Sequence, residues 1–296
     1  MLDSKPLRYF VATAEERHFS RAADRLFVTQ SALSTQILNL EKSLGTKLLN
    51  RNKRSLVTLT TAGQLFLDEA RKALAQIDYA EHIGKRAGRG EVGHIKVGYV
   101  ASAVFSGLLP KVLRIFHEKW PGVTLSLQEI TTPKQYSAIS SQQLDIGFVR
   151  PHSQLDSRIK TKILHYEDLR VALASNHKLA SMSTISVDML HTESFIEPQF
   201  DEPAGFEQQV ALILGNQAKH RVTHKTRDFL TAVTLVSSGY GVAIVPKSAS
   251  NLSIDNVVFL PLENNTIRAE LAIAFREDET SEAVLNMADI AQSSYQ

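Results

Sequence analysis

The apolar positions of the amino-terminal part recur at the spacing of short amphipathic helices. A first helix is predicted over residues 5–18, and a second, shorter one begins at Ser20, a favoured N-cap residue. Thr29 can cap a third helix that ends at Gly45, because glycine tolerates the left-handed backbone that stops a helix. This third helix buries one stripe: Leu33, Ile37, Leu40 and Leu44. The alternating pattern of residues 51–60 predicts a small hairpin, or wing.

Residues 61–89 predict one long helix, since they contain no proline and have glycine only near the ends. Small and apolar side chains fall at heptad spacing along it: Phe66, Ala70, Ala73, Ile77, Ala80 and Gly84. This spacing favours a coiled-coil dimer, and the alternative is a helix lying on its own domain. Residues 88–93 spell G-x-G-x-x-G, but they follow a helix and precede a strand. That order is the reverse of the nucleotide-binding motif, so we interpret them as a linker.

From residue 91 onward, strand-like runs alternate with amphipathic stretches, which predicts an α/β domain with a largely parallel sheet. The expected strands are residues 95–100, 123–129, 145–149, 169–174, 195–196, 220–224, 242–245, 257–262 and 269–275, with another near Ile163. The expected helices are residues 107–119, 133–142, 205–215, 228–238 and 281–291. The predicted fold class is therefore an α+β multidomain protein, helical at first and α/β afterwards.

The composition is that of an ordinary globular protein, with 43% hydrophobic and 22% charged residues. No apolar run is long enough to span a bilayer, and the first residues do not resemble a signal peptide, so we expect a cytoplasmic protein without membrane contact. Because the chain contains no cysteine, it has no disulfide, thiol nucleophile or cysteine-based metal site. We expect no cofactor and no metal.

Charge is unevenly distributed along the chain. Residues 1–90 contain 15 Lys and Arg against 9 Asp and Glu, whereas residues 91–296 contain 18 against 22. A basic domain attached to a slightly acidic one suggests a polyanionic partner that meets only the first part. The same excess also fits an ordinary solvated surface, so the placement of the basic residues decides between the two interpretations.

Two short helices, a turn and a second helix with a polar outer face describe a helix-turn-helix, whose second helix enters the major groove of DNA. The face opposite the leucine stripe presents Ser31, Thr35, Leu38, Asn39 and Lys42. Hydroxyls and amides there can bond base edges and phosphates, and the wing is basic. The predicted DNA-binding residues are Ser20, Thr29, Gln30, Ser31, Ser34, Thr35, Arg51 and Arg54. Each polar position taken singly is also typical of a solvated helix.

Several stretches of this domain carry a family pattern in register. They are Leu7-Arg-Tyr-Phe-Val-Ala12, Phe19-Ser-Arg-Ala-Ala-Asp-Arg-Leu26, Val28-Thr-Gln-Ser-Ala-Leu-Ser-Thr-Gln-Ile37 and Leu59-Thr-Thr-Ala-Gly63. The pattern resembles the LysR-type transcriptional regulators. Ser31 stands where that family often has proline, and Thr35 where it often has arginine, which bears on the operator preference rather than on the fold.

The resemblance implies three parts: a winged helix-turn-helix over residues 1–60, a dimerising linker helix and hinge over 61–90, and an effector domain over 91–296. The effector domain would resemble the periplasmic binding proteins, with subdomain I (residues 91–162 and 268–296), subdomain II (residues 163–267) and a ligand cleft between them. The resemblance also implies a dimer of dimers on promoter DNA and contact with RNA polymerase. The dimer-helix residues would be Phe66, Ala70, Ala73, Ile77 and Ala80.

Ligands of open α/β sheets bind beyond the carboxyl ends of strands, near helix N-termini. That rule selects Ser102, Thr132, Arg150 and the segment Pro198-Gln199-Phe200. Hydroxyls with one arginine can bind a carboxylate, and Phe200 with Phe206 can supply an apolar wall. The alternatives are plain N-capping for the two hydroxyls and a surface ion pair for Arg150.

The stretches Gly98-Tyr-Val-Ala-Ser102 and Asp145-Ile-Gly-Phe-Val-Arg150 are similar to the branch of the family that controls the breakdown of aromatic compounds such as benzoate and catechol. This similarity implies that Ser102, Thr132, Arg150 and Pro198 contact the effector. It also implies that the effector is a small aromatic or unsaturated carboxylic acid.

An enzyme and a transport-type binding protein are the competing interpretations. The sequence has no G-x-S-x-G, G-K-[ST] or H-E-x-x-H motif, and His220 and His224 lie in a strand-like stretch without a partner acid. A binding protein would explain only residues 91–296. The sequence therefore predicts a DNA-binding transcription regulator controlled by a small-molecule effector, and not an enzyme.

Overall fold

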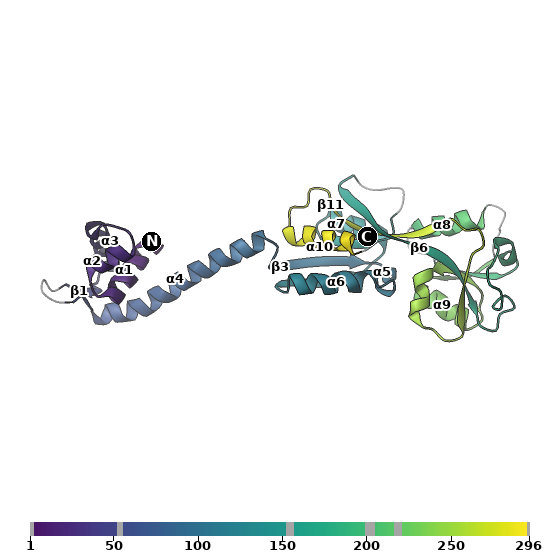
Figure 1. The fold of residues 1–296 in the computed structure, drawn as a ribbon, viewed down its shortest axis with the longest axis horizontal. Coiled ribbons are helices and arrows are strands. Elements are labelled where there is room, and N and C mark those ends of the chain that lie inside the picture. Colours follow the sequence, from purple (N-terminus) through teal and green to yellow (C-terminus); the bar gives the residue numbers. More distant parts are fainter. Residues whose placement is uncertain (1–2, 52–55, 152–156, 199–204, 216–220, 295–296) are drawn as a thin grey trace. The chain divides into compact units, whose positions relative to one another are not determined.

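The computed structural model describes residues 3–51, 56–151, 157–198, 205–215 and 221–294. The chain divides into two compact units, Met1–Lys85 and Arg86–Gln296, and each has hydrophobic cores of its own (Figure 1). Within the described ranges, no helix combines the length and the apolar character needed to cross a lipid bilayer.

The first unit is a helix-turn-helix with a short wing, as predicted. Its elements are α1 (Ser4–Glu16), α2 (Phe19–Arg25), α3 (Gln30–Leu44), β1 (Leu49–Asn50), β2 (Thr58–Leu59) and α4 (Thr61–Gly88). Strands β1 and β2 pair antiparallel and form the wing. Apolar side chains spaced three or four residues apart put Phe10 of α1, and Leu33 and Ile37 of α3, into one core with Leu48 and Leu49.

The start of α2 differs from the prediction. His18, not Ser20, is the N-cap, because its backbone is extended and its Nδ1 accepts the Ser20 N–H at 3.2 Å. Ser20 lies inside the helix instead. The start and end of α3 are as predicted: the Thr29 hydroxyl accepts the Ala32 N–H, and Gly45 ends the helix with a φ of 66°.

The first two heptad positions of α4 pack on their own domain, which is the alternative interpretation of this helix. Phe66 packs against Phe10, with ring centroids 5.3 Å apart, and Ala70 is buried in the same core. The start of α4 must cover this core, and Gly63 allows the approach: a Cβ there would lie 2.0 Å from the Leu48 carbonyl oxygen. The later seam positions are exposed, namely Ala73, Ile77 and Ala80.

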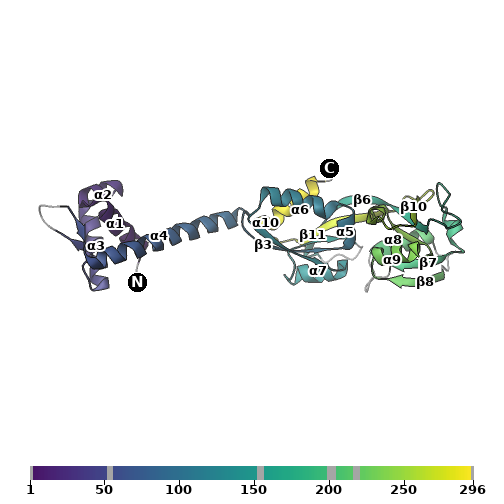
Figure 2. The same cartoon turned by 90° about the horizontal axis from the view of Figure 1, so that it is seen from below.

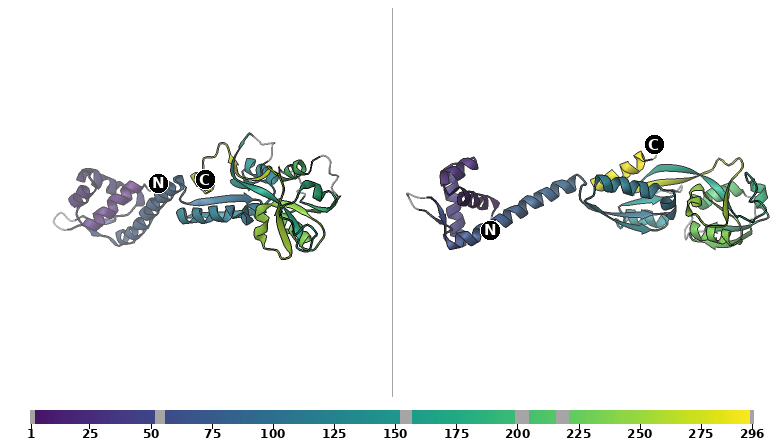
Figure 3. Two further views of the ribbon diagram at one scale, coloured as in Figure 1. Left: turned by 45° about the vertical axis from the view of Figure 1, so that its right-hand side comes forward. Right: turned by 60° about the horizontal axis from the view of Figure 1, so that its bottom comes forward.

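Subdomain I of the second unit is a sheet covered on both faces. Its elements are β3 (Gly93–Tyr99), α5 (Ala101–Phe105), α6 (Leu108–Lys119), β4 (Val123–Glu129), α7 (Thr132–Ser140), β5 (Ile146–Val149), part of β6 (Ile159–Ala174), β11 (Arg268–Arg276) and α10 (Glu282–Ser293). Side chains alternate along β11, so Ile273 and Phe275 face one core and Ala272 and Ala274 face the other. Figure 2 shows α6 and α10 on one side of the strands and α7 on the other. The C-terminal helix, yellow in Figure 3, lies beside α6.

The sheet is mixed, so the prediction of a largely parallel sheet is wrong. Its order is β10-β6-β11-β5-β3-β4, and β9 also pairs with β6. Strand β3 is parallel to β4 and β5, but β11 is antiparallel to β5 and β6, and β6 is antiparallel to β9 and β10. The period-two pattern of a strand is the same in both directions, so the sequence pattern does not reveal the direction of a distant pairing.

Strand β6 is one strand of 16 residues that passes through both subdomains (Figure 1), where two short strands were predicted. Its polar middle, around Glu167 and Asp168, resembles a loop in the sequence. In the structure its backbone groups are bonded to β11. Pairing with β11 extends to Asp168, and pairing with β9 begins at Leu169, so a single strand links the two subdomains.

Subdomain II completes the second unit. Its elements are the 3₁₀ helix η1 (Val187–Leu190), β7 (Ser194–Pro198), α8 (Gly205–Leu214), β8 (Arg221–Thr226), α9 (Phe229–Ser237), β9 (Ala243–Pro246), the 3₁₀ helix η2 (Lys247–Leu252) and β10 (Val257–Pro261). Strands β7 and β8 are parallel, as an alternating strand–helix order predicts. The core joins Phe206 of α8 and Phe229 of α9 to the second half of β6.

Candidate functional site

The outer face of α3 is polar and its inner face is buried, which confirms the predicted orientation of this helix. Leu33 and Ile37 are fully buried, whereas Ser31, Thr35 and Asn39 are exposed. The exposed groups are neutral hydrogen-bonding side chains. They can exchange bonds with base edges without bringing a carboxylate close to a polyanion.

Hydrogen bonds orient the side chains at the start of α3. The Ser20 hydroxyl donates to the Gln30 side-chain carbonyl at 2.8 Å, so the amide nitrogen of this exposed side chain keeps its two N–H donors for other partners. The hydroxyls of Thr29 and Ser31 lie 3.2 Å apart. Ser20 therefore positions Gln30, a role that the sequence analysis did not assign to it.

A buried glutamate ties the wing to α3. Glu41 accepts the N–H groups of Leu48 and Leu49 at 2.8 and 3.1 Å, and its second oxygen pairs with Arg51 at 2.8 Å. The guanidinium of Arg51 also lies over the Phe19 ring, 5.4 Å from its centroid. Arg51, predicted as a DNA contact, is thus engaged within the domain. Sequence reasoning missed Glu41, and Arg54 lies outside the described residues.

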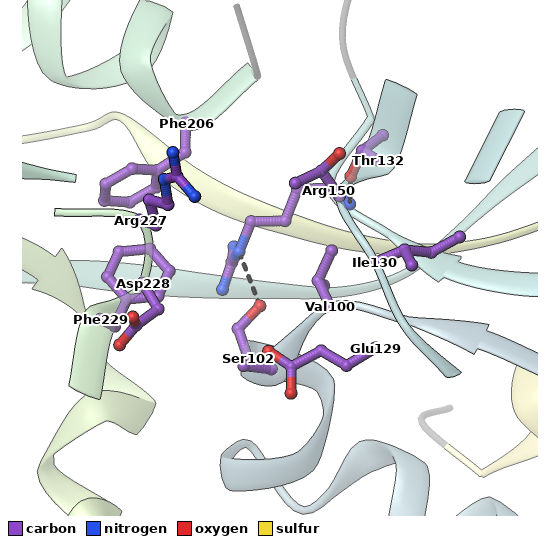
Figure 4. A pocket seen from close by; sticks show the side chains of 12 residues that line it. Val100, Ser102, Glu129, Ile130, Thr132, Arg150, Phe206, Arg227, Asp228 and Phe229 are labelled. Carbon is purple, nitrogen blue, oxygen red and sulfur yellow. Dashed lines mark hydrogen bonds between the residues drawn. The ribbon is translucent and has the colours of Figure 1, made fainter. Parts of the chain in front are cut away.

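The second unit contains a cavity of about 320 Å³ between its two subdomains (Figure 4). Subdomain I contributes the carboxyl ends of β3, β4 and β5 and the starts of α5 and α7. Subdomain II contributes α8 and the entry to α9. The lining residues are Val100, Ala101, Ser102, Glu129, Ile130, Thr131, Thr132, Arg150, Phe206, Arg227, Asp228 and Phe229.

Four of the predicted effector residues line this cavity together: Ser102, Thr132, Arg150 and Phe206. Ser102, Thr132 and Arg150 come from three different strand ends, so the strand-end rule located this side of the cavity correctly. Pro198 ends β7, and Gln199 and Phe200 lie outside the described residues.

Arg150 is buried, so the alternative of a surface ion pair is wrong. Its guanidinium pairs with Glu167 at 2.7 Å, donates to the Ser102 hydroxyl at 3.0 Å and donates to the Glu270 carbonyl at 3.3 Å. Its backbone N–H donates to the Thr132 hydroxyl at 3.1 Å. Burial lowers the pKa of Arg150, and the Glu167 carboxylate opposes that effect, so the two side chains form a compensated pair.

The Arg150–Glu167 pair links the two subdomains. Glu167 lies on β6, and its second oxygen accepts the Ser248 N–H at 3.1 Å, at the start of η2 in subdomain II. The Arg150 guanidinium also lies over two rings of subdomain II, 5.8 Å from the centroid of Phe206 and 6.0 Å from that of Phe229. A change in the angle between the subdomains would therefore disturb these contacts directly.

Sequence reasoning missed the wall that precedes α9. Asp228 caps this helix, because its two oxygens accept the N–H and the hydroxyl of Thr231 at 2.7 and 2.9 Å. Phe229 packs edge-on against Phe206, with ring centroids 4.9 Å apart, and Arg227 completes the wall. The strand-end rule, applied to the strand predicted at residues 220–224, would have selected this segment too.

Comparison with known proteins matches both units. Residues 5–64 match the family model described as "Bacterial regulatory helix-turn-helix protein, lysR family", and residues 88–296 match the "LysR substrate binding domain". The HTH-type transcriptional regulator AlsR of Bacillus subtilis is 33% identical over 295 residues, which is 94% of this chain and 91% of AlsR. BenM of Acinetobacter baylyi is 31% identical over 298 residues, 99% of this chain and 96% of BenM.

Solved structures agree with these matches. The crystal structure of full-length CbnR complexed with its target DNA has a TM-score of 0.84 at 25% identity and covers 100% of both chains. Full-length BenM has a TM-score of 0.62 at 31% identity, with 99% of this chain and 97% of BenM covered.

Proposed function

We propose that this chain, which belongs to the LysR family of bacterial transcriptional regulators, controls promoters in response to a small carboxylic acid bound between its two subdomains. Members of this family are DNA-binding proteins and not enzymes. The proposal specifies the side chains that meet DNA, the class of the effector and the assembly.

Gln30, Ser31, Ser34 and Thr35 are proposed to contact base edges, because they occupy the amino-terminal half of α3 away from the core. Thr29 and Ser20, at the adjacent helix starts, are proposed to lie near phosphates. Arg54 stays a predicted phosphate contact, and Arg51 retains that role only for the part of its guanidinium not bound to Glu41.

The cavity is the observation that carries the effector proposal. Its volume of about 320 Å³ is at the small end of the range for ligand sites. Phe206, Phe229 and Ile130 provide apolar walls, and the hydroxyls of Ser102 and Thr132 provide polar contacts. This combination favours a small aromatic or unsaturated carboxylic acid. The similarity to BenM supports the resemblance to the branch that controls aromatic-compound breakdown.

We propose that the effector closes subdomain I (residues 91–162 and 268–296) against subdomain II (residues 163–267). The Arg150–Glu167 contacts lie between the two and would respond to closure. The exposed part of the α4 seam is proposed to pair with a second copy in a dimer of dimers on promoter DNA. Closure would then alter DNA bending and the contact with RNA polymerase.

Footprinting with DNase I tests this function on the full-length protein and the DNA upstream of the neighbouring gene. Benzoate at saturating concentration is expected to change the boundaries of protection. Gln30→Ala is expected to change which operator variants bind best, whereas Arg54→Ala should weaken all of them equally and make the salt dependence shallower. Identical footprints with and without a bound acid would contradict the closure mechanism.

A further inference from the structure

A fully buried glutamine contacts the segments that line the effector cavity. Gln135 of α7 has no exposed surface, and its amide nitrogen donates to the carbonyl oxygens of Ile130 and Phe148 at 2.9 and 3.2 Å. Its amide oxygen has no hydrogen-bond partner among the residues that the structure describes. A buried oxygen without a partner costs free energy, so an apolar side chain would suit this position better if packing were its only role.

The two carbonyls belong to strand ends that are not neighbours. In the sheet, β3 lies between β4 and β5; Ile130 directly follows β4, and Phe148 belongs to β5. Gln135 therefore bridges across β3, and glycines leave room for it. A Cβ at Gly98 of β3 would lie 3.0 Å from the Gln135 amide oxygen, and a Cβ at Gly147 of β5 would lie 2.4 Å from it. Both glycines are thus matched to the Gln135 side chain.

We propose that Gln135 is a positioning residue that sets the spacing of the strand ends carrying the effector contacts; this rests on the proposed effector function. Thr132 begins α7 just after β4, and Arg150 directly follows β5, so the Gln135 bridge fixes the distance between them. Figure 4 shows Thr132, Arg150 and Ser102 around one cavity. A polar group displaced by about 1 Å no longer meets a ligand at hydrogen-bond distance.

Backbone hydrogen bonds join the third strand end to this bridge. The Phe148 oxygen also accepts the Val100 N–H at 3.0 Å, and Val100 is the N-cap residue of α5, which carries Ser102. The Ile130 N–H donates to the Tyr99 carbonyl at 3.1 Å, at the end of β3. The ends of β3, β4 and β5 thus form one hydrogen-bonded unit, and the buried glutamine supplies a bond to each of the outer two.

Titration calorimetry with benzoate and cinnamate on the full-length protein tests this role. Gln135→Leu keeps a similar volume but loses both donors, and it is expected to weaken binding of the acids by about 10-fold, because the polar contacts lose their alignment. The urea midpoint should change little, since the substitution also removes the unpaired oxygen. Ile139→Val is the matched control. It removes a methyl group from another fully buried residue of α7, so it should lower the urea midpoint and leave the affinity unchanged.

A second pair of variants tests the bridge itself. Gly147→Ala places a methyl group against the Gln135 oxygen, so it should weaken binding of the acids by about 10-fold in the otherwise unsubstituted protein. In the presence of Gln135→Ala, which clears that space, the same change should weaken binding by less than about twofold. Additive losses would contradict the bridge.

Unchanged binding of the acids by Gln135→Leu would overturn the positioning role and leave the proposed function standing, and so would equal losses for Gln135→Leu and Ile139→Val. If the unsubstituted protein binds neither acid, the carboxylic acid effector is wrong and the positioning role falls with it.

Discussion

The Glu167→Gln substitution removes one charge from the buried pair that links the subdomains and keeps the shape of the side chain. Glu167 and Arg150 are both buried, their charged atoms lie 2.7 Å apart, and Glu167 also accepts the Ser248 N–H. Removing one partner of a buried pair costs about 3–5 kcal/mol, because the remaining charge is left uncompensated. Glutamine has one acceptor oxygen and can retain one of the two hydrogen bonds, and its charge-free amide fills the same space, so we expect a loss of about 3 kcal/mol.

The neighbouring residue on the same strand offers a matched control. Asp168 pairs with Arg268 at 3.4 Å, but both side chains are more than half exposed. Exposed ion pairs of this kind contribute about 0.2–1 kcal/mol to the free energy of unfolding. Asp168→Asn should therefore change the free energy of unfolding by less than about 1 kcal/mol, although it also removes one carboxylate charge from β6.

Tryptophan fluorescence during urea unfolding measures the difference. Trp120 is the only tryptophan of the chain and follows α6, where it packs on the Phe116 ring with centroids 5.3 Å apart, so its signal reports the second unit. With a urea dependence of about 3 kcal/mol per molar, the expected loss moves the midpoint down by about 1 M. If Glu167→Gln and Asp168→Asn shift it equally, the argument from burial is refuted.

Three further predictions concern the first unit. Glu41→Gln should lower its melting temperature in circular dichroism, with a loss of about 1–3 kcal/mol, because the buried carboxylate bonds two N–H groups and Arg51; an unchanged melt would contradict this. Phe27→Gly should raise the free energy of unfolding of the first unit by about 0.5–1 kcal/mol. Phe27 is 97% exposed and has a left-handed backbone with a φ of 55°, so glycine relieves backbone strain without loss of packing, at some cost in chain entropy. A lower urea midpoint would count against this prediction. The hydrogen bond from Arg71 holds the pKa of Glu15 below its usual 4.5; burial opposes this effect and Arg25 adds to it. The charged Glu15 therefore stabilises the folded state above pH 4.5. This contribution is lost as the pH falls through the lower pKa of the folded state. Glu15→Gln should flatten this acid limb in denaturation measured between about pH 3 and 7, and parallel curves would disprove it.

Features formed by neighbours in the chain were predictable. The leucine stripe, the Thr29 cap and the Gly45 stop of α3 each depend on residues a few positions apart, and all were found as predicted. One local prediction was wrong: His18, two residues before Ser20, is the N-cap of α2. Glu41 was missed because its partners lie seven or more residues away in the wing, and a glutamate on a helix is usually solvated.

The amino-acid sequence by itself determined the order of helices and strands, the winged helix-turn-helix and the strand ends that carry Ser102, Thr132 and Arg150. Tertiary structure decided the direction of the central strands, the continuity of β6 and the burial of Arg150 against Glu167. The physical reason is distance along the chain. Arg150 bonds groups 48 and 120 positions away, and such contacts depend on sheet direction and register, which the period-two alternation of a strand does not encode.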